Sequence, residues 1–124
     1  MIQSIGLDII EVSRFTLLAR RREQKSWTEC FSPEELTYCF GKTNPALHLA
    51  ARFAVKEAMI KAYSTLAIPL TYNAISVENS GGIPKIICPA AYTDTLTPHV
   101  SISHTTAHAA AFVVVSKNNE HTTH

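Results

Sequence analysis

The hydrophobic pattern at the start of the chain predicts a strand followed by a helix. Apolar residues dominate both alternating faces of residues 5–12, which is typical of a strand covered on two sides. Ser13 then stands where a helix N-cap is expected, and the helix is predicted to run to about residue 25.

Two further helices are predicted in the middle of the chain. Ser32, Pro33 and Glu35 form the capping-box signature of a short helix, which Gly41 ends. Residues 45–66 are rich in Ala, Leu, Met, Lys and Glu and predict a long helix that stops before Ile68-Pro69.

The last third of the chain predicts mainly strands. We expect strands at 72–78 and 85–88 around a hairpin turn at 79–82, a helical turn or two within 89–96, and strands at 100–103 and 109–115. The last strand is apolar enough to be central. Together the elements predict an α+β fold in which a mainly antiparallel sheet packs against one long helix. We expect a single domain over residues 1–117 and a polar C-terminal tail at 118–124.

Composition narrows the class of protein. The 124 residues carry a net charge of +1, with 46% hydrophobic and 17% charged residues, as in an ordinary globular domain. This charge balance predicts no nucleic-acid partner, and no segment predicts a signal peptide or a membrane span. Three cysteines without a C-x-x-C pair argue against a disulfide framework or a structural zinc site, and favour a cytoplasmic protein.

The long helix carries the most informative candidate chemistry. At about 100° per residue, Glu57 and Lys61 fall on one stripe beside Phe53, and Arg52 and Lys56 fall on another. Taken alone, Glu57 and Lys61 are equally typical of an exposed ion pair between successive helical turns.

Asp8 is the second candidate, because it lies within the apolar first strand. Period two places it on the face of Gly6, Ile10 and Val12. An ionised carboxylate there must be paired, hydrogen-bonded or bound to a metal. An Asp that caps a turn or pairs with an Arg satisfies this requirement as well as a metal ligand does.

A basic stripe is predicted on the helix over residues 13–25. Arg14, Leu18, Arg21 and Lys25 align along it. Such a ridge suits an acidic, partly hydrophobic partner helix. A solvated basic face, a membrane surface or nucleic acid fits the same charges.

Near the C-terminus, His104 is flanked by hydroxyl residues, a setting suited to phosphate oxygens. A strand-end histidine bonded to the backbone is the alternative. His104 and His108 have zinc-ligand spacing only if the segment is helical, and no third ligand is evident. Lys42 lies in the loop before the long helix and is expected in solvent.

Three blocks occur in an order that resembles a known family: Ile5-Gly6-Leu7-Asp8-Ile9, then Arg52-Phe53-Ala54-Val55-Lys56-Glu57-Ala58 continuing to Lys61, then Ser101-Ile102-Ser103-His104. The chain resembles the small bacterial holo-[acyl-carrier-protein] synthases of the 4′-phosphopantetheinyl transferase superfamily. The likeness covers residues 5–115. The chain departs from the family in lacking a glycine in the turn after the long helix and in having Ile83 where the family has a lysine.

The resemblance implies a Mg²⁺-dependent reaction between coenzyme A and a serine of an apo acyl-carrier protein. Asp8 and Glu57 are implied to hold the metal, Lys61 to contact the diphosphate, and Glu57 to help remove the serine proton. Residues implied for the 3′-phosphate end of the nucleotide are Arg52 and His104, with Lys56 and Lys42 as further candidates.

The resemblance also implies a homotrimer with active sites between subunits, where His104 serves a neighbour's metal site, and a basic ridge that docks the carrier. Two other interpretations stay open. One is a non-catalytic module that engages RNA or an acidic protein through the basic helix. The other is a relative that binds the nucleotide without turnover.

Overall fold

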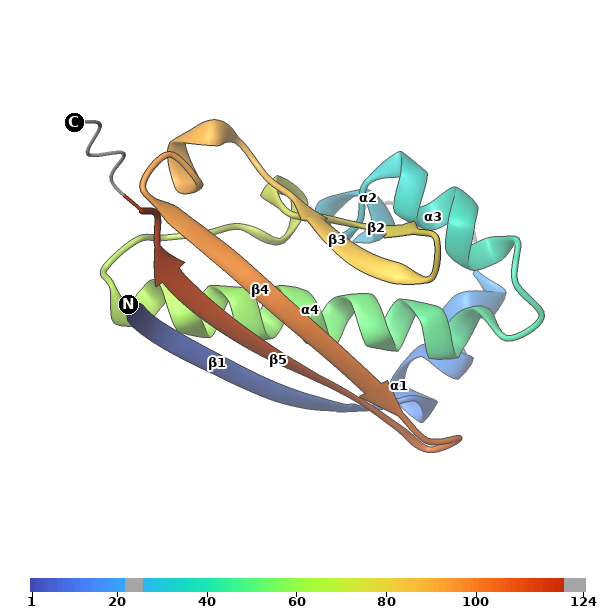
Figure 1. The fold of residues 1–124 in the computed structure, drawn as a ribbon. Helices are drawn as coiled ribbons and strands as arrows, with labels where there is room; N and C mark the ends of the chain where they lie inside the picture. The colour runs from blue at the N-terminus through green and yellow to red at the C-terminus, as the bar shows by residue number, and fades with distance from the viewer. Residues whose placement is uncertain (22–25, 120–124) are drawn as a thin grey trace.

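A three-stranded antiparallel sheet and one long helix form the centre of the molecule. The computed structural model describes residues 1–21 and 26–119. Strands β1 (Ile2–Glu11), β5 (His108–Lys117) and β4 (Leu96–His104) form the sheet in the order β1-β5-β4. Helix α4 (Pro45–Thr65) runs along one face of this sheet (Figure 1). The predicted α+β class, the long helix and the central position of the last strand are confirmed.

Strand β1 is covered on one face only. Ser4, Gly6 and Ile10 face α4 and are buried. The opposite face leaves Ile5, Leu7 and Ile9 exposed by 59%, 62% and 65%. The expectation that this strand is covered on both sides is therefore wrong for the single chain, because nothing in the described part of the chain packs on the outer face.

Gly6 sets the separation between β1 and α4. A Cβ built at this position would lie 1.9 Å from the carbonyl oxygen of Ala58. Only a residue without a side chain allows the strand backbone to touch the helix backbone this closely. The contact places Asp8, two residues further along the same face, over the same part of α4.

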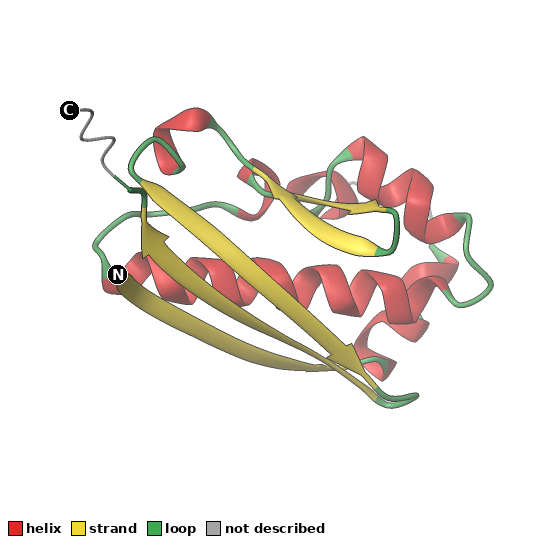
Figure 2. Ribbon diagram, in the orientation of Figure 1, coloured by secondary structure: helices red, strands yellow, loops and turns green. Residues whose placement is uncertain are grey.

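The second sheet is a hairpin of β2 (Ser76–Ser80) and β3 (Ile83–Ile87). Its turn uses Gly81 and Gly82 at φ of +59° and +83°, a conformation that glycine adopts without strain. The predicted hairpin is confirmed, but residues 72–74 form a 3₁₀ turn, η2 (Tyr72–Ala74), rather than the start of a strand. Another 3₁₀ turn, η3 (Ala90–Tyr92), leads to β4 (Figure 2).

The segment after β1 is broken into short pieces. Helix α1 (Ser13–Thr16) is followed by the 3₁₀ turn η1 (Leu18–Arg20), and the chain leaves helical geometry at Arg21. The prediction of one helix over 13–25 is wrong, as is Ser13 as its N-cap, since Val12 holds that position. The backbone turns so that Trp27 of α2 (Ser26–Cys30) packs on buried Phe15, while its indole nitrogen donates to the carbonyl of Arg21 at 2.7 Å. Residues 22–25 lie outside the described residues.

Helix α3 (Pro33–Phe40) begins with the predicted capping box. The Ser32 hydroxyl accepts from the amide of Glu35 at 3.2 Å, and the Glu35 carboxylate accepts from the amide of Ser32 at 2.9 Å.

Asn118, the first residue of the predicted tail, is bonded to the loop before β4. Its side-chain amide donates to the carbonyls of Thr93 and Asp94 at 3.1 and 3.0 Å, and its backbone amide donates to that of Thr95 at 2.8 Å. Residues 120–124 of the predicted tail lie outside the described residues. Within the described ranges, no helix is long and apolar enough to cross a membrane.

Candidate functional site

Asp8 and Lys61 meet where β1 crosses α4. The Lys61 ammonium donates to Asp8 Oδ1 and to the carbonyl of Leu7, both at 3.1 Å. The Asp8 side chain is only 14% exposed, whereas that of Lys61 is 55% exposed. The second Asp8 oxygen, Oδ2, is buried without a hydrogen-bond partner. An unpartnered buried carboxylate oxygen carries a desolvation cost that a cation would remove.

Glu57 lies one helical turn before Lys61, on the same stripe of α4. Its Oε1 accepts a hydrogen bond from the Tyr72 hydroxyl at 2.6 Å. The Tyr72 ring stacks on Phe53, with centroids 5.3 Å apart and planes 14° apart. The hydrogen bond to Glu57, together with burial, raises the pKa of Tyr72 to about 12, so the hydroxyl keeps its proton at neutral pH. We call Asp8, Glu57 and Lys61 the acid site, which the Tyr72 hydroxyl borders through Glu57.

The acid site has the donor chemistry of a Mg²⁺ site that shares its ligands with a substrate. Two carboxylates lie on adjacent elements, and one of them has a buried free oxygen. Among the described residues, no group of three His, Cys, Asp or Glu side chains surrounds a metal position. Mg²⁺ characteristically uses one or two carboxylates and completes its shell with waters and substrate phosphates, so the residues present fit this ion.

Lys56 is buried in the core, contrary to its expected availability to a nucleotide. Its side chain is 0% exposed and its ammonium lies 2.7 Å from Glu35 Oε1. The same ammonium donates to the carbonyl of Tyr72 at 2.9 Å and to that of Ile75. Burial lowers the pKa of Lys56, and Glu35 opposes this shift. With its donors engaged inside the core, Lys56 has a structural role.

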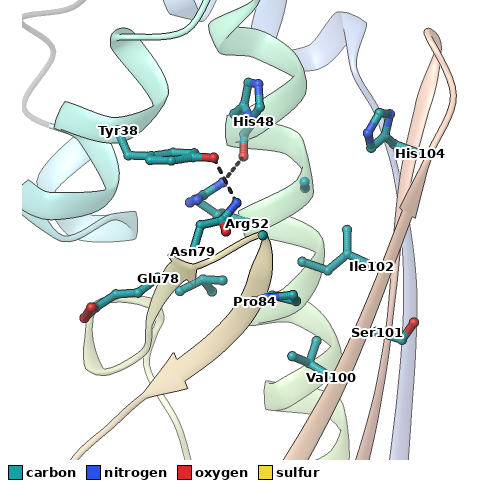
Figure 3. A pocket seen from close by; sticks show the side chains of 13 residues that line it. Tyr38, His48, Arg52, Glu78, Asn79, Pro84, Val100, Ser101, Ile102 and His104 are labelled. Atoms are coloured by element: carbon teal, nitrogen blue, oxygen red, sulfur yellow. Dashed lines mark hydrogen bonds between the residues drawn. The ribbon is translucent and has the colours of Figure 1, made fainter.

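A separate pocket of about 350 Å³ lies between α4, the β2–β3 hairpin and β4. Arg52 is buried in its wall, its guanidinium lies 4.2 Å from the centre of the Tyr38 ring, and its Nε has no hydrogen-bond partner. His104 faces it from the end of β4 (Figure 3). The structure thus brings Arg52 and His104 to one pocket, which we call the cationic pocket.

Two more basic side chains, His48 and Lys42, lie at or beside this pocket, whose lining also includes Glu78. His48, one turn before Arg52 on α4, lines it. Burial lowers the pKa of His48, and Arg52, Lys42 and His104 add repulsion. The Lys42 ammonium lies 4.5 Å from the centre of the Tyr38 ring. An anion would relieve the mutual repulsion of these groups. Sequence reasoning missed Tyr38 and His48, although the i,i+4 spacing of His48 and Arg52 was a usable signal.

The acid site and the cationic pocket lie on different faces of α4. Nine residues separate Arg52 from Lys61, and nine steps of about 100° place them on opposite sides of the helix. Lys61 accordingly contacts β1, whereas Arg52 lines a pocket with β2 and β4. Within one chain, Lys61 contacts the predicted metal residue Asp8, whereas Arg52, predicted for the 3′-phosphate end of the nucleotide, lies on the other side of the helix.

The predicted basic ridge is not a single helical stripe. Arg14 lies on α1, and its guanidinium is 5.6 Å from the centre of the Phe53 ring. Phe53 lies one helical turn before Glu57 on α4. Leu18 is in η1, Arg21 follows the break, and Lys25 lies outside the described residues. Arg14 therefore borders the acid site, whereas the geometry that aligned all four residues is wrong.

Comparisons with known proteins agree on one family. The sequence profile of the 4′-phosphopantetheinyl transferase superfamily matches residues 4–114. A holo-[acyl-carrier-protein] synthase of Thermodesulfovibrio yellowstonii is 39% identical over 117 residues, which cover 94% of this chain and all of that protein.

Solved structures of the same kind have the same fold. A holo-(acyl-carrier-protein) synthase from Bacillus anthracis, in complex with CoA (3′,5′-ADP), matches with a TM-score of 0.77 and 28% identity, covering 96% of this chain and 99% of that one. The enzyme from Helicobacter pylori in complex with coenzyme A matches with a TM-score of 0.73 and 29% identity, covering 90% of this chain and 99% of that one.

Proposed function

This chain belongs to the 4′-phosphopantetheinyl transferase superfamily, among the holo-[acyl-carrier-protein] synthases, and we propose that it moves 4′-phosphopantetheine from coenzyme A to a serine of an apo acyl-carrier protein. The serine hydroxyl attacks the β-phosphate, and the phosphate–oxygen bond to the nucleotide breaks. The products are the holo carrier protein and adenosine 3′,5′-bisphosphate, and the proposed role of the holo carrier protein is in fatty acid biosynthesis.

The observation that carries this proposal is the buried, unpartnered Oδ2 of Asp8, which lies beside Lys61 on the strand that packs against the helix of Glu57. Asp8 and Glu57 are the residues that would hold Mg²⁺. The ion, when bound, would neutralise charge on the diphosphate oxygens and make the β-phosphate a better electrophile.

The side chains of the acid site have separate roles in the proposed transfer. The Lys61 side chain is half exposed, so its ammonium can bind a diphosphate oxygen with a donor that Asp8 does not use. Glu57 is the carboxylate that would accept the serine proton, directly or through water. Arg14, at the border of the acid site, is positioned to attract an acidic carrier protein, and Arg21 extends the positive charge.

The cationic pocket is the proposed site for the 3′-phosphate end of the nucleotide. Its support is the convergence of Arg52, His48 and His104 on one pocket, with Lys42 beside them. A guanidinium with a buried, unpartnered Nε and a histidine are suitable phosphate ligands.

We propose that the active site is completed between copies of the chain in a homotrimer. Two observations support this assembly. The acid site and the cationic pocket lie on opposite sides of α4, so one nucleotide reaches both more readily across an interface. The outer face of β1 also leaves a row of large apolar side chains uncovered. The cytoplasmic location expected from the sequence stays a prediction.

Mass spectrometry of a purified apo acyl-carrier protein tests the reaction. After incubation with coenzyme A, Mg²⁺ and this protein, the carrier should gain the mass of one phosphopantetheine group. Asp8→Asn should abolish the gain and leave the fold intact, while Asp94→Asn, an acid remote from the site, should not change it. The absence of any gain with wild-type protein would refute the proposal. Coenzyme A binding without a gain would identify a relative that binds the nucleotide without turnover.

A further inference from the structure

We propose that Tyr72 is a positioning residue that orients the Glu57 carboxylate for metal binding. This inference rests on the proposed function, because Glu57 has a metal to bind only if that function is correct. The Tyr72 hydroxyl donates to Glu57 Oε1 at 2.6 Å. One carboxylate oxygen is therefore fixed by the protein, and the other is left for the cation.

The Tyr72 ring is held on a rigid surface. It stacks nearly parallel on Phe53, which lies one helical turn before Glu57. Phe53 in turn contacts Phe15 of α1, with ring centroids 5.5 Å apart. A hydroxyl on such a ring has little freedom to follow a moving carboxylate, so it restricts the rotamers of Glu57.

The backbone of Tyr72 is anchored by the buried ion pair. The Lys56 ammonium donates to the carbonyl oxygens of Tyr72, the first residue of η2, and of Ile75, the residue that follows the turn. Glu35, the partner of Lys56, also accepts from the amide of Val77 at 2.9 Å. The pair therefore holds the segment that leads from η2 into β2, and Tyr72 projects from a turn fixed at both ends.

The geometry explains why a lysine and a glutamate adjacent in sequence have unlike surroundings. Lys56 points into the core and holds the Tyr72 backbone, while Glu57 accepts a hydrogen bond from the Tyr72 hydroxyl. One residue of η2 thus links the buried ion pair to the proposed metal ligand. Hydrogen-bond partners of this kind commonly decide how well a metal ligand is oriented.

The test compares Tyr72→Phe with Tyr63→Phe. Tyr72→Phe keeps the ring on Phe53 and removes only the hydroxyl. Tyr63 is the matched control. Its ring is buried on α4, the helix that carries Glu57, and its hydroxyl donates to the carbonyl of Tyr92 at 3.0 Å. Both variants lose one hydroxyl and one hydrogen bond, so general destabilisation affects both.

We measure the Mg²⁺ concentration for half-maximal carrier modification, kcat and the KM for coenzyme A. We also measure Mn²⁺ binding by calorimetry with adenosine 3′,5′-bisphosphate present and no carrier, which needs no turnover. Tyr72→Phe should raise the half-maximal Mg²⁺ concentration and the Mn²⁺ dissociation constant by about ten-fold. Its kcat at saturating Mg²⁺ and its KM for coenzyme A should stay close to wild type, and Tyr63→Phe should change none of the four.

Failure of this inference is distinguishable from failure of the proposed function. If wild-type protein modifies the carrier with Mg²⁺ but Tyr72→Phe leaves the metal dependence unchanged, the positioning role is wrong. The same conclusion follows if Tyr72→Phe lowers kcat equally at every Mg²⁺ concentration, or if Tyr63→Phe shifts metal binding as much. Wild-type protein that neither modifies the carrier nor binds Mn²⁺ overturns the proposed function and this inference with it.

Discussion

Ala67 ends the long helix in a conformation that suits glycine. Its φ is +59°, and the amides of Ala67 and Ile68 donate to the carbonyls of Ser64 and Tyr63, both at 2.9 Å. This double hydrogen bond is the Schellman arrangement, whose left-handed residue is usually glycine. The absence of glycine after the helix, visible in the sequence, therefore leaves an alanine with its Cβ close to a carbonyl oxygen.

Ala67→Gly should stabilise the protein. Removing the Cβ relieves the left-handed strain, and the gain exceeds the added flexibility of the unfolded chain, so we expect the free energy of unfolding to rise by about 1 kcal/mol. Ala67→Val should lower it, because a branched side chain fits this region worse. Urea denaturation measures both variants. A fall in stability for Ala67→Gly would show that the turn does not have this geometry.

His48 should make stability depend on pH. The ordinary pKa of a histidine is 6.5. In the folded protein, burial lowers the pKa of His48 below this value, and repulsion from Arg52, Lys42 and His104 adds to the shift. Below pH 6.5 the unfolded chain therefore binds a proton that the folded chain resists. The stability is complete above pH 6.5 and is lost as the pH falls toward the lowered value. His48→Phe should lose less stability than wild type between pH 7 and 5.5 in urea titrations. Equal slopes would contradict this prediction.

At the scale of elements, the contact between β1 and α4 organises the acid site. The period-two pattern correctly places Asp8 on the face of Gly6 and Ile10, and the helical period places Glu57 and Lys61 on one stripe. Neither pattern says how close the two elements approach. Gly6 determines this distance, because it allows the strand to rest on the carbonyl of Ala58.

Gly6→Ala should separate the strand from the helix. The new Cβ would lie 1.9 Å from a backbone oxygen that cannot rotate away, so we expect a loss of about 3 kcal/mol or more in the free energy of unfolding. Metal binding should weaken as well, because Asp8 moves with the strand. Gly41→Ala is the control: its Cβ would meet the carbonyl oxygen of Thr37 at 3.2 Å at a negative φ, and should cost much less. Similar unfolding curves for the two variants would show that the contact is not tight.

The elements also show what the sequence could predict and what it could not. Local signals were sufficient for the Ser32 capping box, the hairpin at Gly81-Gly82 and the long helix, because each depends on neighbours in the chain. The prediction of one helix over 13–25 is wrong because helical geometry ends at Arg21, whose carbonyl accepts from the Trp27 indole, a contact that helical periodicity does not reveal. The resemblance makes Lys56 a further candidate for the nucleotide, and its burial could not be predicted because its partner, Glu35, lies on another helix, which periodicity does not reveal.

At the scale of the molecule, the uncovered face of the central sheet needs an explanation. Ile5, Leu7 and Ile9 of β1 and Phe112 of β5 are exposed, and Leu7 pairs with Phe112 in the strand register. An isolated apolar residue on a surface is ordinary, but adjacent strands that present apolar side chains on one face form a patch. A second copy of the chain, proposed as the homotrimer partner, has the chemistry to cover it.

Ile5→Glu should therefore dissociate the assembly. A carboxylate at a position that is 59% exposed in the single chain is harmless in a monomer but costly when buried between copies. Light scattering should give a particle of three times the chain mass for wild type and of one chain mass for the variant. The variant should also modify the carrier more slowly, because the acid site and the cationic pocket no longer meet. Ile83→Glu is the matched control for assembly, since Ile83 is 69% exposed on the β2–β3 hairpin and the variant should leave the mass unchanged. If Ile5→Glu keeps the wild-type mass, the outer face of β1 is not the interface; if a monomeric variant stays fully active, one chain contains a complete site.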